Sequence, residues 1–138
     1  MMEPPSALSQ LTAIELAPPQ TIRAAAATGC QAAGIRMIPV MPGGAAYPLM
    51  DDKVLRQETL RAIAETGIGI SDVEIVLLTP DTDLPSFLPF LDAGARIGAK
   101  HVLVADYDPE ENRFAASYAA FCDAAAQFGL TADLEFTP

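Results

Sequence analysis

The chain has 138 residues, 51% of them apolar, and its 18 acidic and 8 basic residues give a formal net charge of −10. This composition is sufficient for one packed domain over residues 1–138 and is too apolar for a disordered chain. The acidic residues are spread along the chain, so we expect it to repel nucleic acid and anionic membranes. Because it lacks a run of about 18 uncharged apolar residues and a basic, apolar start, we expect a cytoplasmic protein.

Four glycines, at positions 29, 67, 98 and 129, each follow an amphipathic, mostly Ala-rich stretch and precede a short apolar run. Glycine after the last helical turn is a typical helix end, because it adopts the left-handed conformation without steric cost. The glycines recur about every 31–38 residues, the size of one strand plus one helix with their loops. The sequence therefore predicts repeated βα units.

In chain order, the pattern predicts strands at residues 11–16, 34–40, 70–78, 101–106 and 131–136. The first helix should begin at Pro18 and Pro19, the second after Asp51 and Asp52, and the third should span about 85–97. The fourth should follow the strand at 101–106 and carry aromatic residues at helical spacing. This alternation predicts a parallel sheet covered by helices.

Two α/β folds fit five strands and four helices. One is an open doubly wound sheet, and the other is the first part of a (β/α)8 TIM barrel that needs about 250 residues. The first predicted strand is not followed by the glycine-rich motif that doubly wound domains often carry. Charged residues instead alternate within strands, as Asp72 and Glu74 do in the third and Asp133 and Glu135 in the fifth, with Arg36 in the second. Because charged groups gather at the mouth of a barrel, this pattern favours the partial barrel, with the open doubly wound sheet as the alternative.

Three segments make a resemblance specific. They are Pro42-Gly43-Gly44-Ala45-Ala46-Tyr47-Pro48-Leu49, Asp72-Val73-Glu74-Ile75 and Leu134-Glu135-Phe136-Thr137-Pro138. In this order and spacing the chain resembles the xylose isomerase-like TIM barrel family of sugar phosphate isomerases and epimerases. The resemblance extends from the first to the fifth strand and implies that the chain is the N-terminal part of such a barrel.

The resemblance also implies an activity. In that family a divalent metal, commonly Mn²⁺, Mg²⁺ or Zn²⁺, is held at the barrel mouth by ligands from the last four strands. Glu135 is similar in position to the fifth-strand glutamate, which implies roles as a metal ligand and as a catalytic acid/base. The implied reaction is isomerisation or epimerisation of a small sugar or sugar phosphate, by proton transfer next to a carbonyl group. The other ligands would lie on later strands, so the chain alone should bind metal weakly.

Four further residues are candidates for substrate binding. Arg36 and Glu74 could form an inward-facing ion pair or orient a substrate hydroxyl or phosphate. Tyr47 lies in the glycine- and proline-rich loop 41–50, which is either a substrate lid or a plain surface loop. Asp106 ends its strand, where it could contact substrate or cap the next helix. His101 begins its strand, so we expect a structural role for it.

A second interpretation is that the chain is a non-catalytic fragment or split subunit. Five strands of a barrel would leave open strand edges and an uncovered sheet face. We therefore expect self-association, either as a homo-oligomer or with a complementing chain that supplies the remaining strands.

Overall fold

The computed structural model describes residues 3–136 and contains one five-stranded parallel sheet. Its strands are β1 (Ala7–Ser9), β2 (Ala32–Arg36), β3 (Gly69–Leu78), β4 (His101–Asp106) and β5 (Thr131–Glu135). Its helices are α1 (Pro18–Ala27), α2 (Lys53–Thr66), α3 (Leu88–Arg96) and α4 (Glu111–Ala126), with 3₁₀ helices η1 (Gln10–Ala13) and η2 (Leu84–Phe87). None of the helices within residues 3–136 has the length and apolar character needed to cross a membrane.

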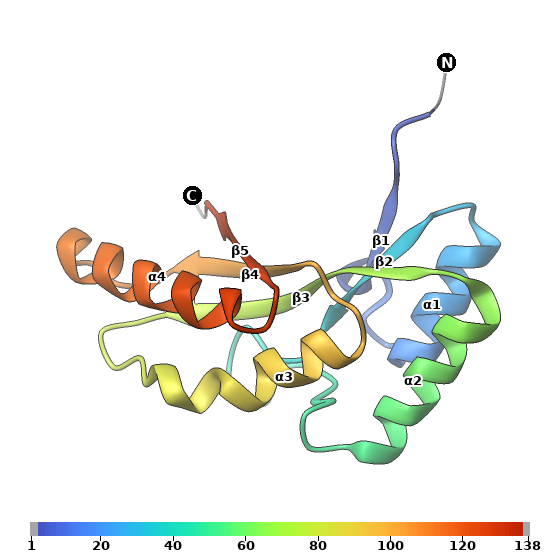
Figure 1. Ribbon diagram of the computed structural model, residues 1–138, viewed down its shortest axis with the longest axis horizontal. Helices are drawn as coiled ribbons and strands as arrows, with labels where there is room; N and C mark the ends of the chain where they lie inside the picture. The colour runs from blue at the N-terminus through green and yellow to red at the C-terminus, as the bar shows by residue number, and fades with distance from the viewer. Residues whose placement is uncertain (1–2, 137–138) are drawn as a thin grey trace.

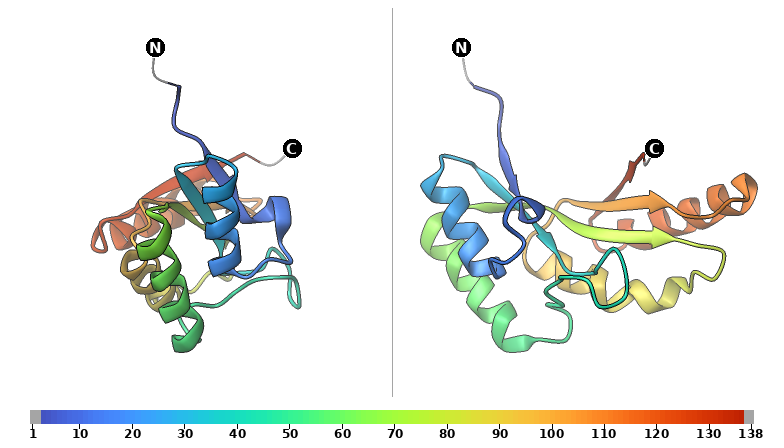
Figure 2. Two further views of the ribbon diagram at one scale, coloured as in Figure 1. Left: turned by 90° about the vertical axis from the view of Figure 1, so that its right-hand side faces the viewer. Right: turned by 180° about the vertical axis from the view of Figure 1, so that it is seen from behind.

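The strands lie side by side in the order β1-β2-β3-β4-β5, and every neighbouring pair is parallel. All four long helices cover the same face of this sheet (Figures 1 and 2). A doubly wound sheet reverses its strand order and carries helices on both faces. The order and the one-sided cover are those of a barrel whose sheet is left open at β1 and β5, so the predicted partial barrel is confirmed.

The dry core lies between the sheet and the helices. It is built from β-branched residues of the central strands and large side chains of the helices, namely Ile22, Ile35, Val73, Val76, Phe90, Leu91, Val102, Val104 and Phe121. Helix α3 lies close to β3 because it has a glycine at the contact: a Cβ atom at Gly94 would lie 3.1 Å from a methyl group of Val73. The opposite face of the sheet has no helix over it among residues 3–136.

The predicted first strand at 11–16 was wrong, because the strand is β1 and the chain turns immediately after it. The side chain of Gln10 is completely buried there. Its Nε2 donates to the Leu16 carbonyl oxygen at 2.8 Å, and its Oε1 accepts from the Arg36 N–H at 2.7 Å. These two bonds bend residues 10–16 into a 3₁₀ helix and turn, and they tie that turn to the end of β2.

The second strand also ends earlier than predicted, at Arg36 instead of residue 40. The N–H groups of Met37 and Ile38 both donate to the Glu74 carbonyl oxygen, at 2.8 and 3.1 Å, so the ladder cannot continue in register. The chain leaves the sheet there and enters the loop that contains residues 41–50. The other three strands and the four long helices lie where the sequence placed them, within a few residues.

Replacing Gln10 with Ala should destabilise the protein by about 2–4 kcal/mol, because the substitution removes buried volume and takes the partner from the Arg36 N–H, while the Leu16 carbonyl oxygen keeps only its bond from Thr21 Oγ1. The free energy of unfolding measured in urea tests this. Gln57→Ala is the matched control, because Gln57 is exposed on α2 and its loss should change stability by less than about 0.5 kcal/mol. Equal stability of the two variants would contradict the structural role given to Gln10.

Candidate active site on the inner face

The inner face is the side of the sheet away from the helices, and it lines a cavity of about 430 Å³. The apolar part of the lining comes from β3 and β4 through Ile75, Leu77, Leu103 and Ala105. The charged part comes from three strands, and it consists of Arg36, Glu74 and Glu135. The fold therefore places Glu135 in the same cavity as Arg36 and Glu74, which the sequence indicated as a possible inward-facing pair.

Arg36 and Glu74 form an ion pair in this cavity. They are register partners on β2 and β3, and Arg36 Nε lies 3.2 Å from Glu74 Oε1. Only 10% and 6% of their side chains are exposed. Burial raises the pKa of Glu74, the Arg36 charge opposes this shift, and the nearby carboxylates of Asp72 and Glu135 add to it. Glu74 is thus a buried carboxyl group beside a second carboxylate at the same face.

Glu135 is the last residue of β5 and is exposed to solvent. Its register partner on β4 is Ala105, so it lies at the carboxyl ends of the strands, the end where barrels carry their active sites. It also lines a second cavity of about 380 Å³ together with Asp106, Glu111, Phe114, Leu134 and Phe136. Glu135 therefore lines both cavities.

Asp106 lies at the end of β4, is exposed, and lines the second cavity. One of its oxygens, Oδ1, accepts from the Asp108 N–H at 2.9 Å. Asp108 in turn accepts two hydrogen bonds from the Arg113 guanidinium, at 2.6 and 2.7 Å, and these lower its pKa. Asp106 thus helps to shape a firmly held loop and has one oxygen left for other contacts.

Tyr47 does not line the inner-face cavity. Its hydroxyl donates to the Ile14 carbonyl oxygen at 2.9 Å, and its N–H donates to the Arg36 carbonyl oxygen at the same distance. The loop is therefore tied back to the turn that precedes α1. Through these two bonds Tyr47 holds the backbone at the end of β2 close to that turn.

His101 begins β4, at the end of the sheet opposite to Asp106, as the sequence predicted. Its Nδ1 lies 3.1 Å from Asp133 Oδ2, and both side chains are nearly half exposed. Glu15 lies in an exposed turn because the predicted first strand does not form there. Neither residue joins the inner-face cavity.

Sequence reasoning missed Gln10, Leu11 and Tyr107. Leu11 and Tyr107 line the inner-face cavity and remain 58% and 48% exposed, so they form an apolar rim beside the charged groups. Gln10 fixes the backbone of Arg36. A buried glutamine in a short apolar stretch has no distinctive sequence signal. Apolar residues directly after strands, such as Leu11 and Tyr107, are a usable signal of an exposed apolar surface.

The fit of a metal ion to these residues can be tested by counting ligands. Within residues 3–136, no group of three or more His, Cys, Asp or Glu side chains is placed to hold one. Glu135 offers a carboxylate, but Glu74 is already committed to Arg36. The described residues thus do not form a complete metal site.

Comparison with solved structures supports the fold. The chain is similar to a xylose isomerase domain containing protein from Salmonella typhimurium LT2, with a TM-score of 0.74 and 12% identity over 93% of this chain and 47% of that one. It is also similar to an uncharacterised protein from Parabacteroides distasonis ATCC 8503, with a TM-score of 0.70 and 14% identity over 96% of this chain and 52% of that one. The chain spans about half the length of each of these structures.

At such low identity the similarity shows the fold alone. A scan against protein-family models finds no match. A search of curated proteins finds none either. The fold is therefore an open five-stranded parallel α/β sheet similar to about half of a xylose isomerase domain containing protein, and this similarity assigns no chemistry to the site.

Removing one partner of the Arg36–Glu74 pair should destabilise the protein by about 3–5 kcal/mol, because the other charge would be left buried and alone. Replacing both, as in the double variant Arg36→Met with Glu74→Leu, should recover most of that loss. Urea unfolding of the two single variants Arg36→Met and Glu74→Leu and of the double variant measures this coupling. Strictly additive losses would contradict a structural ion pair.

The raised pKa of Glu74 predicts a pH dependence of stability. Between the usual glutamate pKa of about 4.3 and its higher folded value, the folded state binds more protons than the unfolded state. The free energy of unfolding should therefore fall as pH rises through this window. The Glu74→Gln variant lacks this contribution. The free energy of unfolding of the wild-type protein should therefore fall relative to that of the variant as pH rises. A difference that does not change with pH would contradict the assignment.

Proposed function

We propose that the inner face is the first half of an active site that isomerises or epimerises a small sugar or sugar phosphate. The observation that supports this proposal is the convergence of Arg36, Glu74 and Glu135 on one cavity at the carboxyl ends of parallel strands. Sites that bind small polar molecules combine an apolar wall with a few converging polar groups, as this cavity does. The similarity in fold to a xylose isomerase domain containing protein supports the same proposal by analogy.

Glu135 is the proposed acid/base. An accessible carboxylate can take the proton from a carbon next to the substrate carbonyl and return it to the other face of the same carbon, which epimerises it. For isomerisation the proton returns to the former carbonyl carbon, while the hydroxyl proton of the first carbon passes to the carbonyl oxygen. The Arg36–Glu74 pair is proposed to bind substrate: an Arg36 N–H donates to a substrate oxygen, and Glu74 accepts from a substrate hydroxyl. Asp106 does not line the inner-face cavity, but it lines the second cavity together with Glu135 and is proposed there as a further hydroxyl acceptor. Tyr47 has no substrate contact in this proposal, and its role is limited to the hydrogen bond from its N–H to the Arg36 carbonyl oxygen.

A divalent metal, Mn²⁺, Mg²⁺ or Zn²⁺, belongs to the proposal only for a completed barrel. When bound it would polarise the substrate oxygens, and Glu135 would be its one ligand from this chain. The other ligands would have to come from a second copy or a complementing chain. The proposed setting is cytoplasmic, with no nucleic-acid or membrane partner, in keeping with a net charge of −10.

The open sheet favours a second candidate, a non-catalytic subunit that self-associates. The edges β1 and β5 lack a neighbouring strand among the described residues. Apolar side chains near both edges are exposed, with Leu11 at 58% and Phe136 at 88%. Free strand edges and apolar patches both promote association with another chain.

Activity tests separate the two candidates. In deuterated buffer with Mn²⁺, the protein should exchange protons next to the carbonyl of a small ketose, as followed by NMR. Glu135→Gln should slow this exchange by a factor of about 10²–10⁴, because it removes the acid/base. Asp123→Asn, on the exposed surface of α4, is the control and should leave the rate unchanged. No exchange by the wild-type protein would favour the non-catalytic subunit, and a rate unaffected by Glu135→Gln would contradict the role of Glu135.

The oligomeric state gives a separate prediction. Sedimentation of the wild-type protein at micromolar concentration should show dimers or larger species. Substituting Leu11 and Phe136 together with Ser should shift it toward monomer and change the free energy of unfolding by less than about 1 kcal/mol, because both side chains are exposed. Val54→Ser removes a similarly exposed apolar side chain on the outer side of α2 and should have no effect. A monomeric wild-type protein would contradict the account of the open edges.

A further inference from the structure

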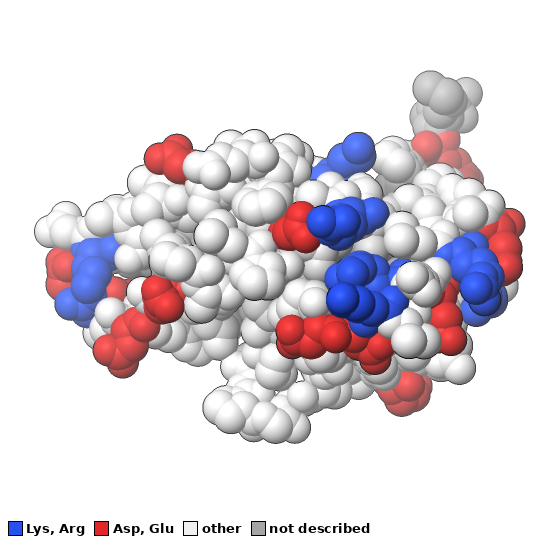
Figure 3. All heavy atoms as spheres, turned by 60° about the horizontal axis from the view of Figure 1, so that its bottom comes forward, with Lys and Arg blue, Asp and Glu red and all other residues white. Residues whose placement is uncertain are grey.

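The basic residues of this acidic protein are concentrated on two neighbouring helices. Helices α1 and α2 carry Arg23, Lys53, Arg56 and Arg61 against Glu58 and Glu65, so the pair has a local excess of positive charge in a chain of net charge −10. Figure 3 shows the helix-covered side of the molecule, where such basic and acidic side chains lie beside one another. This surface is on the opposite side of the sheet from the inner-face cavity.

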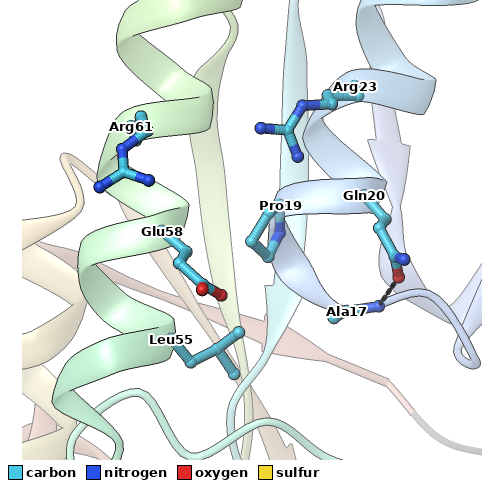
Figure 4. A pocket seen from close by; sticks show the side chains of 7 residues that line it. All are labelled: Ala17, Pro19, Gln20, Arg23, Leu55, Glu58 and Arg61. Carbon is cyan, nitrogen blue, oxygen red and sulfur yellow. Dashed lines mark hydrogen bonds between the residues drawn. The ribbon is translucent and has the colours of Figure 1, made fainter.

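A groove of about 340 Å³ separates these helices. Its lining includes Pro19 of α1 and Leu55 of α2. Arg23 extends from α1 toward α2, and Arg61 lines the opposite wall with its side chain directed along α2 toward Glu58 (Figure 4). The Glu58 carboxylate points toward Pro19, one turn before Arg61 on the same helix. The groove thus offers two guanidinium groups at one end and a carboxylate at the other.

The two guanidinium groups have unused hydrogen-bonding capacity. Among the described residues, Arg61 has no hydrogen-bond partner, although the other five arginines each donate to a carboxylate or a carbonyl oxygen. Arg23 makes a single contact with Glu65, at 3.2 Å, and both side chains are more than half exposed. Exposed pairs of this kind are weak, so Arg23 can turn to a ligand at little cost.

We propose that this groove binds a small hydroxylated acid, with its phosphate or carboxylate group between Arg23 and Arg61. Guanidinium groups bind both kinds of oxyanion through paired hydrogen bonds. Glu58 can only accept hydrogen bonds, so it selects a ligand that carries a hydroxyl group at the other end. Pro19 and Leu55 exclude water from one side of the ligand. The site is separate from the inner face, and it stands whether or not the proposed isomerase activity does.

The test is a titration of the whole protein, at constant ionic strength, with glycerol phosphate, glycerate, inorganic phosphate and glycerol. The arginine Nε–H resonances in NMR spectra report on each guanidinium group directly. Glycerol phosphate or glycerate should shift the Arg23 and Arg61 signals and saturate in the millimolar range, and the tighter of the two identifies the preferred acid group. Inorganic phosphate should bind more weakly, and glycerol should have no effect.

Matched variants make the site specific. Arg61→Gln and Arg23→Gln should each weaken binding about tenfold, the effect of losing a charge-assisted hydrogen bond. Arg96→Gln is the control, because Arg96 is an exposed arginine on α3 whose loss changes the net charge equally. Glu58→Ala should remove the preference for glycerol phosphate over phosphate, because it removes the acceptor for the ligand hydroxyl. Shifts that do not saturate, or an equal loss of binding in Arg96→Gln, would overturn the proposal.

Discussion

The buried contact between Arg36 and Glu74 is the constraint on which the inner face depends. Two charges can remain in a nearly dry place only if they stay together, so the pair opposes any slip of β2 against β3. Gln10 adds a second constraint, because its bond to the Arg36 N–H holds the turn after β1 against the end of β2. A few polar atoms therefore fix the register of β1, β2 and β3. This register sets the positions of the carboxyl ends of the strands, where the candidate site lies.

The two faces of the sheet differ in kind. The helix-covered face is a dry core of β-branched and aromatic side chains, and it accounts for the stability of a chain this short. The inner face carries apolar residues around a charged centre and has open strands at both sides. In a closed barrel such residues would be enclosed by further strands. The same arrangement is therefore the basis of both the proposed chemistry of this face and its predicted association.

Much of the fold could be predicted because its signals are local. Glycines at helix ends, prolines at the start of α1 and apolar runs at the strands mark the elements directly, and alternating charges correctly favoured a barrel. The first strand was misplaced because the turn depends on Gln10 bonding to Arg36, which is 26 residues away. Local patterns do not report such a contact. The sequence did suggest that Arg36 and Glu74 pair on the inner side of the sheet, because period-two alternation is a local signal. It did not indicate that Tyr47 bonds to Ile14, which is 33 residues away.

The most direct test of the candidate site is to map where Mn²⁺ approaches the protein, using the paramagnetic broadening of backbone amide signals in NMR spectra. This measurement detects weak binding and does not require turnover. If the account is correct, Mn²⁺ will bind weakly, because Glu135 is its one ligand from this chain, but it will broaden the amides of Leu77, Ala105 and Glu135 at the carboxyl ends of the strands more than amides elsewhere, and Glu135→Gln will reduce this local effect. Broadening centred on His101 and Asp133 at the other end of the sheet, or spread evenly over the acidic surface, would contradict it.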